Sequence, residues 1–191
     1  MAIWTLAVEG PSDEAVVAAV LRANGHDVGV VHGKRGKHHL DGNIHGYARA
    51  AMHAPWLIVR DLDQDAACAA ELLAAKQPGG HPGCVRIAVR AIEAWLLADP
   101  ASAQWLGVAS SLLPRDVEGL EDPKEALVNL ARRSRSATIR ADIVPTLSRS
   151  IGPGYVDQVR TFCALRWRPD VAARRSESLA RLIRHVQRRQ P

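Results

Sequence analysis

Long apolar runs are missing from this 191-residue chain. No stretch approaches the roughly 18 consecutive apolar residues of a membrane-spanning helix, so we expect no membrane association. The amino terminus lacks the basic region of a secretory signal peptide and runs directly into a strand-like segment at Ile3. We therefore expect a cytoplasmic protein. Its 47% hydrophobic and 24% charged residues are typical of a globular domain.

Cysteine is scarce as well. Cys68, Cys84 and Cys163 are widely spaced and form no CxxC pair, which gives little support to a redox motif or a zinc site. The histidines near residue 40 lack a cysteine at ligand spacing, so they do not change this conclusion. Each cysteine has apolar neighbours, and we predict three buried free thiols.

Two common catalytic signatures are also missing. No GxSxG motif is present, which argues against a serine hydrolase of that type. The glycine-rich segment 33–37 lacks the GxxxxGK[ST] spacing, and His38 stands where a Walker loop places Ser or Thr. Any use of ATP would therefore require another chain. Lys34, Arg35 and Lys37 either bind nucleic-acid phosphates or form a solvated basic loop, and the sequence leaves both readings open.

The first half of the chain alternates strand-like and helix-like segments. Strands are predicted over 3–8, 27–32, 56–61 and 84–89, and helices over 12–23, 43–53, 64–76 and 91–97. This order predicts an α/β fold with a mostly parallel sheet and helices on both faces. Beyond Asp99 only helices are predicted, over 101–106, 123–133, 139–149, 155–166 and 170–189. We expect an α/β domain over 1–107 and a helical extension over 108–191.

Acidic residues stand at the ends of two predicted strands. Glu9 follows the first strand, and Asp61 and Asp63 close the third. A charge at the end of a buried strand is costly unless a cation holds it. The carboxyl edge of a parallel sheet is also where open α/β folds bind ligands. Because Mg²⁺ and Mn²⁺ prefer carboxylate oxygens, the pattern predicts a divalent metal site and phosphate chemistry.

Two further carboxylates can reach the same edge. Asp13 lies one turn into the helix that Glu9 introduces, and Glu93 begins the helix after the fourth strand. We expect Asp61 and Asp63, two residues apart on a strand, to leave the same face. A second reading stays open, in which these aspartates cap turns and pair with Arg60, Arg86 or Arg90.

These motifs carry a family resemblance. Strand-Glu9-Gly10 followed by strand-Asp61-Leu62-Asp63 resembles the Toprim domain of topoisomerases, primases and overcoming-lysogenisation-defect nucleases. The wider sequence, including Glu93-Ala94-Trp95-Leu96 and Asp122-Pro123-Lys124, looks similar to uncharacterised bacterial Toprim-like proteins. The resemblance implies that Asp61 and Asp63 bind Mg²⁺ and that Glu9 is a metal ligand or a general acid or base.

The resemblance to the overcoming-lysogenisation-defect nucleases implies further roles. An acidic residue four positions after the first glutamate is matched by Asp13, and a later glutamate by Glu93, so both are expected to bind metal. Those enzymes also use a lysine near the metals, which makes Lys124 a candidate for transition-state stabilisation; the other reading is a surface lysine. Arg90 either holds the nucleic-acid backbone or pairs with the acidic residues.

Charge suggests a polyanionic partner. The net charge is +5 and the sequence pI is about 9.6, with arginines concentrated after Arg166. We expect a Mg²⁺- or Mn²⁺-dependent nuclease that acts on DNA more readily than RNA and that can form a homodimer. The resemblance implies a bacterial defence or mobile-element system with an ATPase partner protein. The alternative is a non-catalytic module that binds nucleic acid or a partner.

Overall fold

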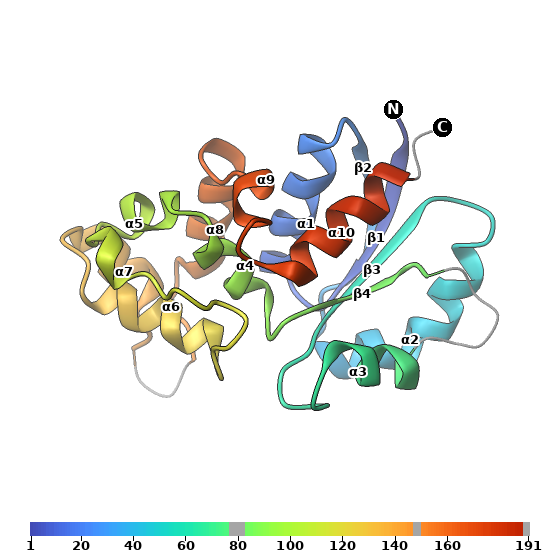
Figure 1. Ribbon diagram of the computed structural model, residues 1–191, viewed down its shortest axis with the longest axis horizontal. Helices are drawn as coiled ribbons and strands as arrows, with labels where there is room; N and C mark the ends of the chain where they lie inside the picture. Colours follow the sequence, from blue (N-terminus) through green and yellow to red (C-terminus); the bar gives the residue numbers. More distant parts are fainter. Residues whose placement is uncertain (77–82, 147–149, 189–191) are drawn as a thin grey trace.

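The fold is a four-stranded, all-parallel sheet flanked by helices (Figure 1). The computed structural model describes residues 1–76, 83–146 and 150–188. The strand order is β2-β1-β3-β4. The strands are β1 (Ile3–Val8), β2 (Asp27–Gly33), β3 (Trp56–Asp61) and β4 (Val85–Ala88). The predicted α/β class, with its parallel sheet and helical carboxyl-terminal part, is confirmed, and the arrangement is consistent with a Toprim-like fold.

Each face of the sheet packs against its own pair of helices. Side chains alternate along the strands, so Leu6 and Leu57 lie in one hydrophobic core while Ala7 and Ile58 lie in the other. The first core includes α1 (Pro11–Ala23) and α10 (Glu177–Arg188). The second includes α2 (Lys37–Ala50) and α3 (Ala69–Lys76). Figure 1 shows these helix pairs on opposite sides of the strands. Burial on both faces explains why β1 and most of β3 are continuously apolar, whereas the edge strand β2 is only partly buried.

The turn between β1 and α1 shapes the carboxyl edge of the sheet. Helix α1 begins at Pro11, one residue before the predicted start, with Gly10 as its N-cap. Proline suits the first helical position because its missing N–H would have no partner there. Asp13 at the third position accepts a hydrogen bond from the Gly10 amide, as in a capping box. This contact turns Asp13 toward the end of β1.

The remaining helices follow β4. They are α4 (Ile92–Ala98), α5 (Ala101–Leu106), η1 (Ser110–Leu112), α6 (Pro123–Arg132), α7 (Ala137–Ile143), α8 (Tyr155–Leu165), α9 (Pro169–Ala172) and α10. The helix expected over 170–189 is divided into α9 and α10, and residue 189 lies outside the described residues. The helix expected over 139–149 ends at Ile143, and 147–149 also lie outside the described range.

The helical region shares one core with the sheet. Leu179, Leu182 and Val186 of α10 belong to the same buried cluster as Trp4 and Leu6. Helix α10 therefore returns to the sheet after the chain has formed the intervening helices. The boundary proposed at residue 107 stays a prediction.

Two local predictions about α2 and α3 were wrong. Helix α2 begins at Lys37 rather than near residue 43, so the basic loop between β2 and α2 is short. Helix α3 begins at Ala69 rather than at 64, which leaves Cys68 in an exposed turn. Cys84 and Cys163 are buried free thiols, as predicted. Among the described residues no helix is long and apolar enough to cross a bilayer.

Candidate functional site

Four carboxylates lie near one another at the carboxyl edge of the sheet. Glu9 follows β1, Asp13 lies in α1, Asp61 ends β3 and Glu93 lies in the first turn of α4. Asp13, Asp61 and Glu93 are buried, and Glu93 is 0% exposed. Glu9 is half-buried. We call these four residues the buried acidic group.

Backbone amides hold three members of the buried acidic group. The Asp61 amide donates to Glu9 Oε1 at 2.8 Å, which places the first glutamate directly beside the end of β3. The Ile92 amide at the start of α4 donates to Asp61 Oδ1 at 3.1 Å. Asp13 receives the Gly10 amide at 2.5 Å. These contacts fix one oxygen of each of the three carboxylates.

Glu93 has a different set of partners. The Tyr155 hydroxyl of α8 donates to Glu93 Oε1 at 2.7 Å, and Lys124 Nζ of α6 lies 3.5 Å from the same oxygen. Glu93 Oε2 is buried and has no hydrogen-bond partner. A buried carboxylate oxygen without a partner is costly. The site therefore contains an acceptor that a cation or a proton donor would satisfy.

Burial raises the pKa values of three members of the buried acidic group, Glu9, Asp13 and Asp61. Burial raises the pKa of Asp13 to about 7, with further contributions from Glu93 and Glu9. Burial also raises the pKa of Asp61 well above its usual value, and Asp13 and Glu93 add to the effect. Burial raises the pKa of Glu9 as well, against the opposing effects of the Asp61 amide and Arg60. The site disfavours its own negative charge.

Lys124 partly compensates for that charge. Its pKa is raised, chiefly by Glu93 and then by Asp61 and Asp13, although burial opposes the shift. Helix α6 begins at Pro123 with Asp122 as its N-cap, so Lys124 is in the first turn. A cation is unfavourable there for the helix dipole. The carboxylates of the buried acidic group offset that cost.

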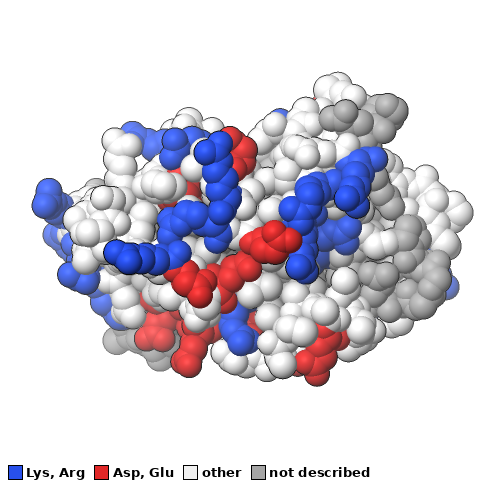
Figure 2. Space-filling model, in the orientation of Figure 1, with Lys and Arg blue, Asp and Glu red and all other residues white. Residues whose placement is uncertain are grey.

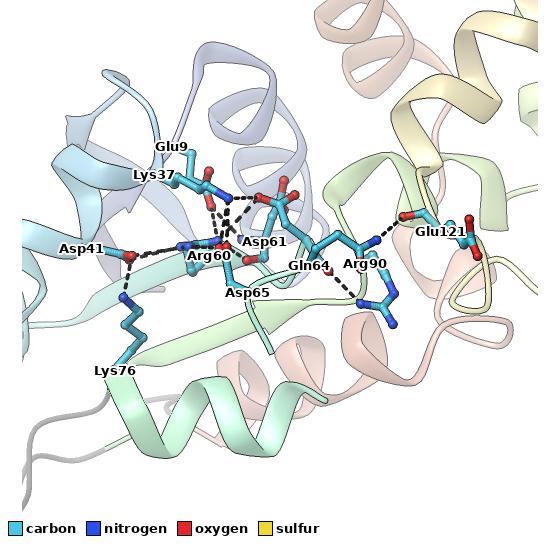
Figure 3. Close-up of polar contacts among 11 residues, drawn as sticks. Glu9, Lys37, Asp41, Arg60, Asp61, Gln64, Asp65, Lys76, Arg90 and Glu121 are labelled. Atoms are coloured by element: carbon cyan, nitrogen blue, oxygen red, sulfur yellow. Dashed lines mark hydrogen bonds and ion pairs between the residues drawn. The ribbon is translucent and has the colours of Figure 1, made fainter. Parts of the chain in front are cut away.

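A second acidic set lies next to the first and is paired with cations. Asp41, Asp63 and Asp65 are bound by Lys37, Arg60 and Lys76; we call these six residues the ion-paired group. Arg60 is 1% exposed and lies at the centre of these contacts (Figure 3). Its Nε is 3.1 Å from Asp41 Oδ1, and its Nη2 is 2.5 Å from Asp65 Oδ2. Arg60 Nη1 also lies 3.4 Å from Glu9 Oε1, which connects the two groups.

Asp61 and Asp63 do not share a face, contrary to the prediction. Strand β3 ends at Asp61, and Asp63 lies in the following turn with φ of 48°. Aspartate tolerates this left-handed conformation better than most residues. The turn directs the Asp63 carboxylate to Lys37 Nζ at 3.0 Å and Arg60 Nη1 at 3.8 Å. The reading in which an aspartate pairs with an arginine applies to Asp63, whereas Asp61 belongs to the buried acidic group.

The predicted phosphate-binding residues are divided between exposed and paired positions. Lys34 and Arg35 are exposed, and Lys34 Nζ lies 3.1 Å from Glu14 Oε2. Lys37 is bound to Asp63 and Asp65. Arg90 donates to the Asp63 carbonyl at 2.7 Å. It lines a cavity of about 330 Å³ at the edge of the site, formed by Asp63, Gln64, Arg90, Ala91, Glu121, Asp122, Pro123 and Lys124.

A larger cavity borders the outer edge of the sheet. Its volume is about 480 Å³, and it lies between α3, β4 and α10. Arg86 of β4 and the α10 residues Arg181, Arg184 and Arg188 line it, together with Glu118 and Glu177. Glu177 is ion-paired with Arg181 and Arg184. Figure 2 shows a band of Lys and Arg side chains over α10 in this view. Strand β4 runs along this cavity and leads to Arg90 and Glu93 at the site.

The donor atoms suit a hard cation. The buried acidic group supplies only carboxylate oxygens, which Mg²⁺ and Mn²⁺ prefer, and Glu93 Oε2 has no partner. Within residues 1–76, 83–146 and 150–188, no three His, Cys, Asp or Glu side chains converge as a ready metal site. The carboxylate oxygens are the donor type that such an ion prefers, and a bound cation would relieve the repulsion between the carboxylates. Binding requires the side chains to turn toward the ion.

Several contact residues were missed by sequence reasoning. Tyr155 is separated from Glu93 by 62 positions. Asp41 lies in α2 and Lys76 in α3, on the face of the sheet opposite to α1. No local motif signals such contacts; only a complete three-dimensional arrangement brings these residues together.

Comparison with protein-family models, with curated proteins and with solved structures gives no match for this chain. The Toprim resemblance therefore stays a prediction from the sequence motifs, and the function proposed below depends on the geometry of the site.

Proposed function

We propose that this protein is a Mg²⁺- or Mn²⁺-dependent nuclease that hydrolyses phosphodiester bonds. The observation that carries the proposal is the buried acidic group: four carboxylates at the carboxyl edge of a parallel sheet, with the buried Glu93 Oε2 lacking a partner. Structural carboxylates of a folded domain are normally satisfied, whereas perturbed and incompletely satisfied ones cluster at functional sites.

Asp13, Asp61 and Glu93, with Glu9 beside them, would hold the metal ion. When bound, the ion would polarise a phosphate oxygen and lower the pKa of a water molecule. Asp63, for which the sequence suggested the same role, is excluded from this set because Lys37 and Arg60 bind it.

The chain's own residues supply the remaining functions. Lys124, held by Glu93, is positioned to stabilise negative charge that develops on the phosphate. Glu9 is half-buried beside Asp61 and keeps the assignment of metal ligand or general acid or base. Tyr155 orients Glu93 through its hydroxyl. Arg90 and Lys124 line the 330 Å³ cavity, which suits a phosphate of the substrate.

The polyanion would reach the site along the cavity beside β4, whose lining holds more arginines than glutamates. Arg181, Arg184 and Arg188 of α10 supply positive charge there, and such contacts bind the phosphate backbone without reading sequence. Lys34 and Arg35 extend the positive surface on the other side. DNA is the proposed substrate ahead of RNA, in a bacterial defence or mobile-element system where a partner chain supplies any ATPase activity. The protein would act in the cytoplasm, and a homodimer is compatible with this role.

The proposal is tested by incubating pure protein with plasmid and with single-stranded DNA and RNA. Cleavage should require Mg²⁺ or Mn²⁺ and stop with EDTA. Asp61→Asn should lower the rate by at least about 100-fold, the scale of losing one group that organises transition-state charge. Asp157→Asn, an exposed change on α8, is the matched control and should cleave normally. Cleavage that persists in EDTA or in folded Asp61→Asn protein would contradict the proposal.

One observation favours a non-catalytic module instead. Asp63, which the sequence motif pairs with Asp61, is neutralised by Lys37 and Arg60. A module that binds nucleic acid or a partner would use the basic surface and need no metal. That function would be supported if the protein bound DNA with equal affinity in EDTA and in Mg²⁺ and cleaved none of the substrates.

A further inference from the structure

The two neighbouring acidic sets differ in how their charge is balanced. In the ion-paired group, three carboxylates (Asp41, Asp63, Asp65) face three cations (Lys37, Arg60, Lys76). In the buried acidic group, Asp13, Asp61 and Glu93 interact with Lys124, and Glu9 lies beside Arg60. The deficit of positive charge is therefore confined to the buried acidic group.

Arg60 occupies the space between the two sets. It extends from β3, is 1% exposed, and directs Nη1 toward Glu9 and Asp63 while Nη2 binds Asp41 and Asp65. Nη1 also donates to the carbonyl of Asp61. A guanidinium stays protonated at any physiological pH, so this position holds a permanent positive charge.

A divalent ion bound by Asp63 would have to lie close to that charge. Asp63 Oδ2 is 3.8 Å from Arg60 Nη1 and 3.0 Å from Lys37 Nζ. Like charges at such distances repel strongly in a partly buried site. The carboxylates of the ion-paired group are already neutralised by lysine and arginine side chains, so a metal ion would add little stabilisation there.

The buried acidic group offers the opposite conditions. Glu93 is fully buried, its Oε2 lacks a partner, and Asp13 and Asp61 lie close enough to interact with it electrostatically. Lys124, whose side chain is 41% exposed, interacts with all three. An added cation would satisfy an acceptor there rather than displace one that is already bound.

We propose that each chain binds a single divalent cation, at the buried acidic group, and that Arg60 serves as a built-in cation in the position beside Asp63 where a second ion would otherwise bind. This inference rests on the proposed function, because it states how many metal ions that site uses. It makes Arg60 a positioning residue, which orders Glu9 and the Asp63 turn without touching the substrate.

The test counts bound Mn²⁺ by calorimetry and by electron paramagnetic resonance on the full chain. Wild-type protein should bind one ion. Asp61→Asn and Asp63→Asn are matched substitutions two residues apart. Asp61→Asn should weaken Mn²⁺ binding at least about tenfold, and Asp63→Asn should change it less than about threefold, since the loss of a metal-site group costs 10–100-fold. Two bound ions, or equal weakening by both substitutions, would overturn the inference.

Arg60→Met provides a second readout. Where circular dichroism shows that this variant folds, removal of the built-in cation should allow a second Mn²⁺ to bind, and Asp63→Asn added to it should abolish that ion. A folded Arg60→Met protein that still binds one ion would contradict the role given to Arg60. Where it does not fold, the inference is tested by the number of Mn²⁺ ions bound to wild-type protein and by the comparison of Asp61→Asn with Asp63→Asn.

The outcomes separate this inference from the proposed function. One bound ion with no cleavage of any substrate would leave the count intact and reject the nuclease. Metal-dependent cleavage by protein that binds two ions would support the nuclease and reject the single-ion inference. Folded wild-type protein that binds no Mn²⁺ would reject both.

Discussion

The buried acidic group and the ion-paired group lie side by side at one sheet edge, yet they have opposite electrostatic character. Asp61 and Asp63 illustrate this difference, although they are only two positions apart in the sequence. Asp61 accepts one backbone amide and lies among other buried acids, and its pKa is raised by burial and by Asp13. Asp63 lies in the next turn, bound by Lys37 and Arg60.

The comparison shows that acidity alone does not define a metal site. Both groups contain three or more carboxylates, but the ion-paired group is self-neutralised and contributes to the fold. The buried acidic group retains uncompensated charge, which costs stability unless a ligand is bound. Substitutions in the two groups should therefore act on stability in opposite directions.

The largest effect is expected from Arg60→Met. Its removal leaves Asp41, Asp65 and Glu9 without their central cation, and breaking a buried ion pair costs about 3–5 kcal/mol. Urea unfolding monitored by circular dichroism should show that loss in the free energy of unfolding. Arg181→Met, at an exposed position of α10, is the control and should change the free energy of unfolding by less than about 0.5 kcal/mol. A loss below about 1 kcal/mol for Arg60→Met would remove the distinction between the two groups.

The pH dependence of stability should come from the buried acidic group. The pKa of Asp13 rises from 3.8 when exposed to about 7 in the folded protein. Between these values the folded state binds the proton more tightly, so the stability contribution is full below pH 3.8 and is lost as pH rises to about 7. Each pKa unit corresponds to about 1.4 kcal/mol. Asp13→Asn should flatten the metal-free stability profile over this window.

The matched control for that experiment is Asp27→Asn, an exposed change in β2. It should leave the pH profile unchanged. An unaltered profile in Asp13→Asn would show that Asp13 does not share the buried environment described above.

Tyr155→Phe should have an intermediate effect. It removes the hydroxyl that donates to Glu93 Oε1 at 2.7 Å and leaves a buried carboxylate with fewer partners. The expected loss in the free energy of unfolding is about 1–2 kcal/mol in metal-free protein. Saturating Mn²⁺ should reduce this loss of stability, because the ion binds Glu93. Thermal unfolding of wild-type and Tyr155→Phe protein with and without Mn²⁺ measures the difference. Equal losses in both conditions would place Tyr155 outside the site.

Asp61→Asn should produce the smallest change in stability and in the favourable direction. The amide side chain keeps an oxygen for the Ile92 amide and removes one charge from a repulsive cluster. We expect metal-free protein to be stabilised by about 1 kcal/mol, the pattern of an active site that exchanges stability for function. Asp63→Asn should instead destabilise slightly, because it weakens contacts to Lys37 and Arg60. The reverse ranking in chemical denaturation would contradict the comparison.

The sequence predicted the sheet and the strand-end acids because both follow from local patterns. Continuous apolar runs specify doubly buried strands, and parallel strands end at one edge, which brings Glu9 to Asp61. The prediction that Asp61 and Asp63 share a face was wrong because it assumed that the strand continues to Asp63, whereas β3 ends at Asp61. The left-handed Asp63 backbone depends on the turn after β3 rather than on residue spacing.

The contacts that separate the two groups could not be predicted from local patterns. Arg60 was expected only as one possible partner of the aspartates, and its contact with Asp41 crosses from β3 to α2. Tyr155 reaches Glu93 only after the helical region has packed against the sheet. Long-range contacts of this kind depend on how helices dock, which propensity and periodicity do not specify.

The most direct test of the central claim is a Mn²⁺-soaked crystal of the wild-type protein, with anomalous diffraction used to locate the ion. The account predicts one anomalous peak within coordination distance of Asp61 and Glu93, at about 2.0–2.6 Å from carboxylate oxygens. A peak between Asp63 and Asp65, or no peak at a Mn²⁺ concentration that saturates binding in solution, would contradict it.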